Sequence, residues 1–581
     1  MRPSVTIALV AASLVAALPL LEAWDASKPA REPEVFVTQI APADRLQQAL
    51  NRLTYGPRPG DVERVRAIGL EKWIERQLHP ESIPENPELS EKLRYLDTLD
   101  LSSSQLVLDY PSPEVVRQMV MGQIPYPTDP EIRMMIAKMV ARTEQKQGQD
   151  AAAADPNAPQ LQRLEDLLTE DQIRSLRTGT PEQRLAAFQA LPADKQDDAI
   201  MAMGPGMRQA LFAAAPPSLR RKLELANGPV QVVARDLAEA KVLRAIYSER
   251  QLAEVLDDFW FNHFNVFFDK GADRYLVTAY ERDAIRPHVL GKFRDLLEAT
   301  AQSPAMLFYL DNWQSVGTDA PQPRQAKQAR RGLNENYGRE LMELHTLGVN
   351  GGYTQKDVTE VARCFTGWTI YKPQMGGRFF FNARLHDNGQ KVVLGVAIPA
   401  GGGMADGEKV LDILARRPST AHFISRELAA RFVADDPPQA LVDRMADTFL
   451  STDGDVRQVL ETMFHSKEFW SVGAYRSKVK SPFEMVASAV RASGGNVDFA
   501  AALVNQVAQM GEPLYRKMEP TGYSNSSQEW MNAGGLLARM NFAVQLAGGR
   551  LPGVKLELAD NTNPGALREG VQLGSPEFQK H

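Results

Sequence analysis

The chain has a single cysteine, Cys364, among its 581 residues. A disulfide within the chain needs two cysteines, so the fold must rest on packing alone, even in an oxidising compartment. Cys364 falls in an amphipathic helical stretch with no histidine close to it in the sequence. We therefore interpret it as a buried structural thiol rather than a catalytic nucleophile.

The chain also lacks an excess of positive charge. It has 66 lysines and arginines against 72 acidic residues, which leaves no basic field for a nucleic acid. A Gly-x-Ser-x-Gly elbow, a phosphate-binding loop and a dinucleotide fingerprint after a strand are all missing from the sequence. We therefore expect no nucleic-acid partner, no dinucleotide and no nucleotide chemistry.

Long apolar runs are confined to the beginning of the chain. Met1-Arg2-Pro3 precedes an apolar run from Val5 to Leu21, followed by a polar turn. This layout predicts a signal peptide over residues 1–23, with an uncleaved N-terminal anchor as the alternative. We expect an exported protein, periplasmic or extracellular, or one that its N-terminus anchors to the inner membrane.

What the sequence does contain is helical periodicity, and 44% of its residues are hydrophobic. We predict a mainly α fold: a multi-helix globular body with one small β-hairpin and an inserted short-helix repeat module. The expected regions are an N-terminal helical region at 44–143, a central and C-terminal helical body at 229–546, and a fraying polar tail at 547–581. The hairpin is predicted to join Phe379–Leu385 to Lys391–Val396 through an Asn388-Gly389 turn.

Residues 144–228 are predicted to hold a flexible linker, Glu144–Pro159, followed by the repeat module. Helix starts recur at a spacing of roughly twelve residues, near Thr169, Thr180, Pro192, Pro205 and Pro216. Helices this short are unstable alone in water, so they should stack on one another. We favour a solubilising or spacing role for the module over a dedicated binding domain.

Two long motifs carry a family resemblance: LDDFWFNHF at 256–264 and NENYGRELMELHTLG at 334–348. They resemble the bacterial family catalogued as domain of unknown function 1800. Shorter motifs extend the resemblance: LTYG at 53–56, GGYTQKDV at 351–358, ARCFTGW at 362–368, His386-Asp387, Lys391, FISREL at 423–428, SKVKSP at 477–482 and PTGY at 520–523. The resemblance implies a large exported bacterial protein without an agreed reaction, often encoded beside a sulfatase-like family that is a possible protein partner.

The helical wheel turns two titratable side chains inward. His263 falls near the middle of the apolar arc of 252–267, and Glu340 falls inside the arc of 333–348, with Glu343 beside it. A carboxylate in an apolar face must be protonated, paired with a cation or bound to a metal. His345 should instead sit in the last helical turn, where a partly charged imidazole complements the helix end.

Three interpretations of His263 and Glu340 stay open. In the first, both are structural residues whose hydrogen-bonding groups find nearby partners, for instance Arg363 or backbone groups. In the second, they form a metal or acid-base site with Glu343, suited to zinc, manganese or iron. In the third, they line a ligand pocket without turnover.

The reaction, if there is one, stays unknown at this point. The leading hypothesis is an envelope or secretion-associated scaffold or binding protein. The alternative is a metal-dependent enzyme that uses His263 and Glu340 as catalytic residues. The cofactor is unknown, and a divalent metal is the candidate. A glycan or peptide is a possible ligand, because the aromatic loop from Tyr515 to Trp530 offers rings for stacking, although tyrosines and tryptophans at a helix junction more often only pack.

Overall fold

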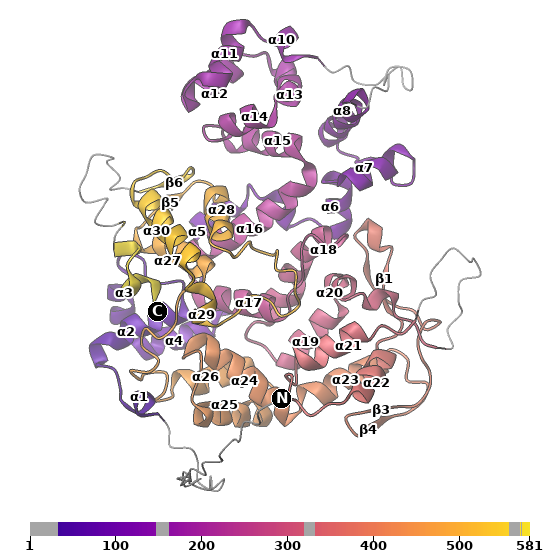
Figure 1. Cartoon of the computed structure of the whole chain (residues 1–581), viewed down its shortest axis with the longest axis vertical. Helices are drawn as coiled ribbons and strands as arrows, with labels where there is room; N and C mark the ends of the chain where they lie inside the picture. The colour runs from indigo at the N-terminus through magenta and orange to yellow at the C-terminus, as the bar shows by residue number, and fades with distance from the viewer. Residues whose placement is uncertain (1–32, 147–161, 319–331, 557–569, 571) are drawn as a thin grey trace, which may run out of the picture.

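Helices dominate the computed structural model, which describes residues 33–146, 162–318, 332–556, 570 and 572–581 (Figure 1). Six short strands form three two-stranded sheets within these ranges. The prediction of a mainly α fold is confirmed. Among the helices of the described residues, none combines the length and the apolarity needed to cross a membrane. The predicted signal peptide lies outside the described residues.

The N-terminal helices pack around α16 (Pro229–Tyr247) and α17 (Gln251–His263). Helix α16 is buried on nearly all sides, which explains why its apolar residues show no one-sided stripe. Of these N-terminal helices, α2 and α4 contact α17, and α5 contacts α16. The N-terminal helices are α1 (Glu34–Val37), α2 (Arg45–Leu53), α3 (Asp61–Ile68), α4 (Leu70–Leu78), α5 (Pro87–Leu93), α6 (Ser103–Asp109), α7 (Pro113–Val120) and α8 (Pro130–Lys146).

The short-helix module forms a separate lobe at one end of the molecule (Figure 1). Its helices begin where the sequence predicts, because Thr169 and Thr180 cap two of them with capping boxes. They enclose an apolar cluster of their own, with Leu176, Phe188 and Leu211 at its centre. The helices are α10 (Leu164–Leu167), α11 (Glu170–Thr178), α12 (Pro181–Gln189), α13 (Ala193–Ala202), α14 (Pro205–Phe212) and α15 (Pro217–Asn227). Of the predicted linker, residues 144–146 end α8, and 147–159 lie outside the described residues.

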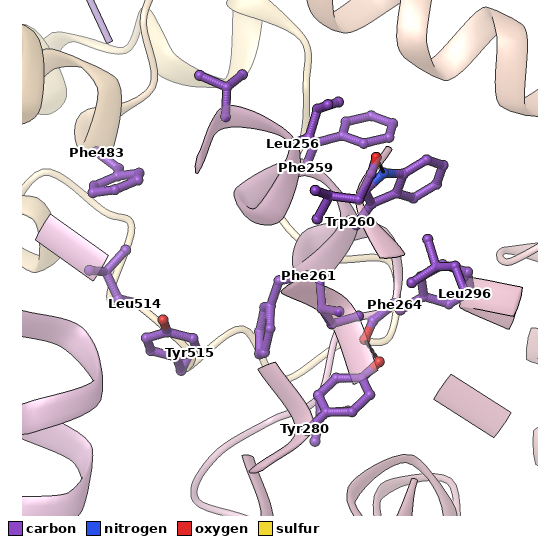
Figure 2. Close-up of a cluster of buried hydrophobic side chains, with 14 of the residues drawn as sticks. Leu256, Phe259, Trp260, Phe261, Phe264, Tyr280, Leu296, Phe483, Leu514 and Tyr515 are labelled. Atoms are coloured by element: carbon purple, nitrogen blue, oxygen red, sulfur yellow. Dashed lines mark hydrogen bonds between the residues drawn. The ribbon is translucent and has the colours of Figure 1, made fainter. Parts of the chain in front are cut away.

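The remaining helices complete the body around α17. Figure 2 shows its aromatic side chains in the core, where Phe261 packs between Tyr280 and Tyr515. The Tyr280 hydroxyl donates to the Phe264 carbonyl over 2.7 Å. The helices are α18 (Asp273–Ala279), a π-helical turn (Tyr280–Ile285), α19 (Phe293–Gln302), α20 (Pro304–Tyr309), α21 (Glu335–Glu343), α22 (Gln355–Cys364), α23 (Ala405–Ala415), α24 (Pro418–Phe432), α25 (Gln439–Ser451), α26 (Val456–Phe464), α27 (Pro482–Ala492), α28 (Ala501–Gln509), α29 (Ser527–Trp530), α30 (Ala533–Ala547) and α32 (Pro576–Gln579).

The strand pairing differs from the predicted hairpin. β1 (Trp368–Tyr371) pairs with β2 (Arg378–Phe381), and β3 (Lys391–Val393) pairs with β4 (Val396–Ile398). Asn388-Gly389 is therefore not the hairpin turn. The β3–β4 turn is Leu394-Gly395, whose φ angles of 49° and 82° give the left-handed backbone that a tight two-residue turn requires. The third sheet joins β5 (Asn496–Val497) to β6 (Val554–Lys555).

The last residues dock on the body, so the expectation of a fraying tail is wrong for 572–581. His581 is 3% exposed and exchanges two backbone hydrogen bonds with Lys478, of 2.9 and 3.3 Å. Its Nδ1 lies 3.1 Å from the carbonyl of Asn51. These contacts come from parts of the chain that are far apart in sequence, which is why the polar composition of the tail gave no sign of them.

Candidate functional site

His263 is the last residue of α17 and is partly buried. Its Nε2 lies 3.1 Å from the carbonyl oxygen of His345. Burial lowers the pKa of His263 to about 4, so the ring is neutral at pH 7. Because a carbonyl only accepts hydrogen bonds, the proton of this neutral ring lies on Nε2, and Nδ1 carries a lone pair.

His345 is buried, contrary to the prediction of a partly charged residue at a helix end. It is 2% exposed, and burial lowers its pKa to about 3. Its Nε2 has no hydrogen-bond partner within the described part of the chain. Helix α21 ends at Glu343, and the turn that follows packs the His345 ring against Phe264, with ring centroids 5.0 Å apart. A tertiary contact, not helix periodicity, thus decides its environment.

Glu340 and Glu343 lie in the last turn of α21. Burial, and then the charge of Glu343, raises the pKa of the half-buried Glu340. Glu343 accepts a hydrogen bond of 3.0 Å from the hydroxyl of Tyr353. Arg363 does not meet Glu340 as expected, because it pairs with Glu360 at 2.8 Å and with Asp387 at 2.9 Å.

No hydrogen bond or ion pair between His263 and Glu340 occurs in the described ranges. Within those ranges, no three His, Cys, Asp or Glu side chains are grouped so that they could hold a metal ion. A shared site of His263, Glu340 and Glu343 therefore stays a prediction. His263 faces a cavity instead.

His263 lines a cavity of about 410 Å³ between α17, α24 and the segment 520–526, here called the His263 cavity. A smaller cavity of about 60 Å³, the Lys241 cavity, lies next to it. The two share part of their walls: Phe259 and Asn262 from α17, and Tyr523, Ser524 and Asn525. The segment 513–526, here called the strap, thus borders both cavities.

Side chains of α17 and the loop after it hold the strap in place. Asn262 receives a hydrogen bond of 2.6 Å from the Tyr523 backbone nitrogen and donates one of 2.8 Å to the Tyr523 carbonyl. Asn265 donates to the carbonyls of Lys517 and Glu519 at 3.0 and 2.9 Å. Gly522 is required where the strap passes α17, since its φ is 68° and a Cβ there would lie 2.3 Å from the Asn262 carbonyl.

Each basic side chain that lines the two cavities is paired with a carboxylate. The four pairs are Lys241–Asp258 at 2.9 Å, Arg431–Glu484 at 2.5 Å, Lys478–Asp435 at 2.6 Å and Arg426–Asp436 at 3.0 Å. Asp436 is 91% exposed and lines neither cavity, whereas two further carboxyl groups, Glu427 and Glu512, do line them. Burial raises the pKa of Glu427 above its usual value.

Glu512 is mostly protonated at pH 7. Burial, and then the charge of Asp258, raises its pKa to about 8. Its Oε2 accepts a hydrogen bond of 2.8 Å from the Phe483 backbone nitrogen, in the first turn of α27. The cavities therefore contain many hydrogen-bonding groups but little net charge at neutral pH.

Two aromatic rings, Tyr523 and Trp530, line the Lys241 cavity. Tyr523 and Trp530 are half-buried, and their ring centroids lie 6.1 Å apart. The Trp530 Nε1 donates to the Ser524 carbonyl over 3.1 Å, which fixes the indole against the strap. The sequence indicated these rings as possible stacking groups, but the cavities beside them come only from tertiary packing.

Five segments that carry the family resemblance meet at the two cavities. They are 256–264, 334–348, 423–428, 477–482 and 520–523, which contribute Asn262, Leu344, Arg426, Lys478 and Tyr523 among others. Sequence reasoning singled out His263 here but missed Arg431, Glu484 and Glu512. Their acidic or basic character shows in the sequence, whereas their convergence does not.

The comparisons with known proteins support only a family assignment. A family model described as "Protein of unknown function (DUF1800)" matches residues 48–577. No curated protein matches the chain significantly. No solved structure does so either.

Proposed function

The chain belongs to this family of proteins of unknown function, and from the geometry of its own cavities we propose that it is an exported binding protein for a neutral glycan. The ligand would lie in the His263 and Lys241 cavities, along the strap. This proposal follows the hypothesis of a binding protein rather than that of a metal-dependent enzyme.

The observation that carries the proposal is the pairing of charge at the cavities. The three buried basic side chains, Lys241, Arg431 and Lys478, already have carboxylate partners, so a charged ligand inside the cavities would have to break an ion pair or remain unbalanced. An uncharged ligand rich in hydroxyl groups meets no such penalty, because it can donate to paired carboxylates and accept from paired cations.

The aromatic pair Tyr523 and Trp530 supports the same class of ligand. An aromatic face packs well against the apolar face of a sugar ring, and the polar edges of Tyr523 and Trp530 hold the two rings in place by donating to the carbonyls of Pro513 and Ser524. The strap is held by hydrogen bonds within the chain, from Asn262 and Asn265. Preorganisation of this kind reduces the entropy lost on binding.

The proposal is tested by calorimetric titration with neutral oligosaccharides of hexose and of N-acetylhexosamine units. We expect Trp530→Ala to weaken binding of the best oligosaccharide at least tenfold, which corresponds to about 1.4 kcal/mol. Tyr371→Ala serves as the control, because Tyr371 is a 50% exposed aromatic residue that lines neither cavity.

Two results would contradict the proposal: no oligosaccharide binds while a charged peptide does, or Trp530→Ala binds as tightly as the unchanged protein. The alternative, a metal-dependent enzyme, is tested separately by elemental analysis. It predicts stoichiometric zinc, iron or manganese in the purified protein, and loss of that metal in Glu340→Gln.

A further inference from the structure

A separate cavity of about 280 Å³ is lined by an unusual number of arginines. It lies between α3, α4 and α27, beside the turn that follows the LTYG motif at 53–56. Trp73 and Ile68 contribute apolar walls. Its charged lining consists of four arginines, Arg58, Arg64, Arg76 and Arg491, and two carboxylates, Asp61 and Glu249.

The two carboxylates do not balance the four guanidinium groups. Arg58 pairs with Glu249 at 2.7 Å, and both Arg64 and Arg491 pair with Asp61, Arg491 at 3.4 Å. Arg76 forms no ion pair with any residue that the structure describes. Two positive charges are therefore left in excess at this cavity, in contrast to the balanced charges of the His263 and Lys241 cavities.

Arg491 is fixed in position and cannot turn away from the cavity. Its side chain is 1% exposed, and it donates to the carbonyls of Gly56 at 2.6 Å and Ile246 at 2.7 Å. Burial, and then the charge of Arg58, lowers the pKa of Arg491 to about 9. An incompletely balanced buried cation is costly, and an anion in the cavity would relieve that cost.

We propose that this cavity binds a small oxyanion of the phosphate or sulfate class. Guanidinium groups match the oxygen geometry of such anions and bind them through paired hydrogen bonds. Arg491 and Arg58 would hold the anion from the inside, and the more exposed Arg64 and Arg76 would close on it from the solvent side.

The test is calorimetric titration of the full chain with inorganic phosphate at constant ionic strength. We expect the double variant Arg64→Gln, Arg76→Gln to bind phosphate at least tenfold more weakly than the unchanged protein. Both side chains are exposed enough for the fold to survive the change. Arg66→Gln is the matched control, because Arg66 is an exposed arginine of α3 that does not line the cavity.

Phosphate should also raise the melting temperature, whereas chloride at the same ionic strength should not. Equal stabilisation by chloride, equal weakening in Arg66→Gln, or no phosphate binding would overturn the proposal. A parallel titration with glycerol phosphate distinguishes the source of the anion. Tighter binding of the ester than of inorganic phosphate identifies the end group of a larger ligand, and weaker binding identifies the free anion.

Discussion

At the scale of single residues, burial changes the titration of the groups around the cavities more than local sequence does. His263 and His345 are neutral because they are desolvated. Glu512 keeps its proton for the same reason. The sequence identified His263 and Glu340 as inward-facing from their place on a helical wheel. It gave no such sign for Glu512, which lies in an irregular segment without periodicity.

Glu512→Gln should stabilise the protein relative to the unchanged chain, and this difference should grow as the pH rises. The folded chain holds the Glu512 proton up to a pKa of about 8, against an ordinary value of 4.5. The protonated Glu512 side chain therefore contributes fully to the free energy of unfolding below pH 4.5, and this contribution is lost as the pH rises through 8. Glutamine has no charge to desolvate and its amide oxygen still accepts from the Phe483 nitrogen, so we expect a gain of up to about 4 kcal/mol at pH 8, at about 1.4 kcal/mol per unit of pKa shift.

Denaturant unfolding of both proteins between pH 4 and pH 8 measures this difference. The exposed Glu91→Gln is the control and should follow the unchanged protein. Parallel stability curves for Glu512→Gln and the unchanged protein would show that Glu512 is ionised in the fold.

At the scale of elements, helix ends were predictable and strand pairing was not. Ser481 with Glu484 and Thr354 with Asp357 form capping boxes, in which the two residues are three positions apart as the motif requires. The Asn388-Gly389 pair was a misleading turn signal. Asp387, in the loop between β2 and β3, pairs with Arg363, and Lys391 at the start of β3 donates to Asp406 at 2.6 Å. These ion pairs fix the loop in a conformation other than a two-residue hairpin turn.

Gly522→Ala should detach the strap from α17. The new methyl group would clash with the Asn262 carbonyl, and the φ of 68° disfavours any residue with a Cβ. We expect a loss of about 1–3 kcal/mol in stability. Amide hydrogen exchange should become faster in 513–526.

Gly352→Ala is the control for this change, because its φ is 80° but nothing lies within 4 Å of the added Cβ. It should show the backbone cost alone, with no change of exchange in the strap. Unaltered exchange in the strap of Gly522→Ala would mean that Asn262 does not hold it.

At the scale of the whole molecule, the described residues contain two separate apolar clusters. The larger fills the body, and the smaller lies within the short-helix module. Separate cores unfold independently when few contacts join them. The repeated helix starts of the module lie where the sequence predicts them. The cavities, by contrast, are built by segments that are hundreds of residues apart.

Phe188→Ala should unfold the module and leave the body intact. Phe188 is 1% exposed within the smaller cluster, and loss of a buried phenylalanine side chain costs about 3–5 kcal/mol. We expect hydrogen exchange to increase throughout 164–227 and to stay unchanged in α17 and α24. Phe365→Ala, which removes a buried phenylalanine from the larger cluster, should give the opposite pattern. A single transition shared by both variants would show that the clusters fold as one unit.

The sequence by itself determined the mainly helical character, many helix boundaries, the repeat in the module and the family resemblance. These depend on periodicity and capping, which act over a few residues. Only the tertiary structure decided which charges meet at the His263 and Lys241 cavities, that His345 is buried, and that four arginines surround one space. The physical reason is that charge balance and desolvation depend on contacts between distant segments, and local sequence patterns do not encode those contacts.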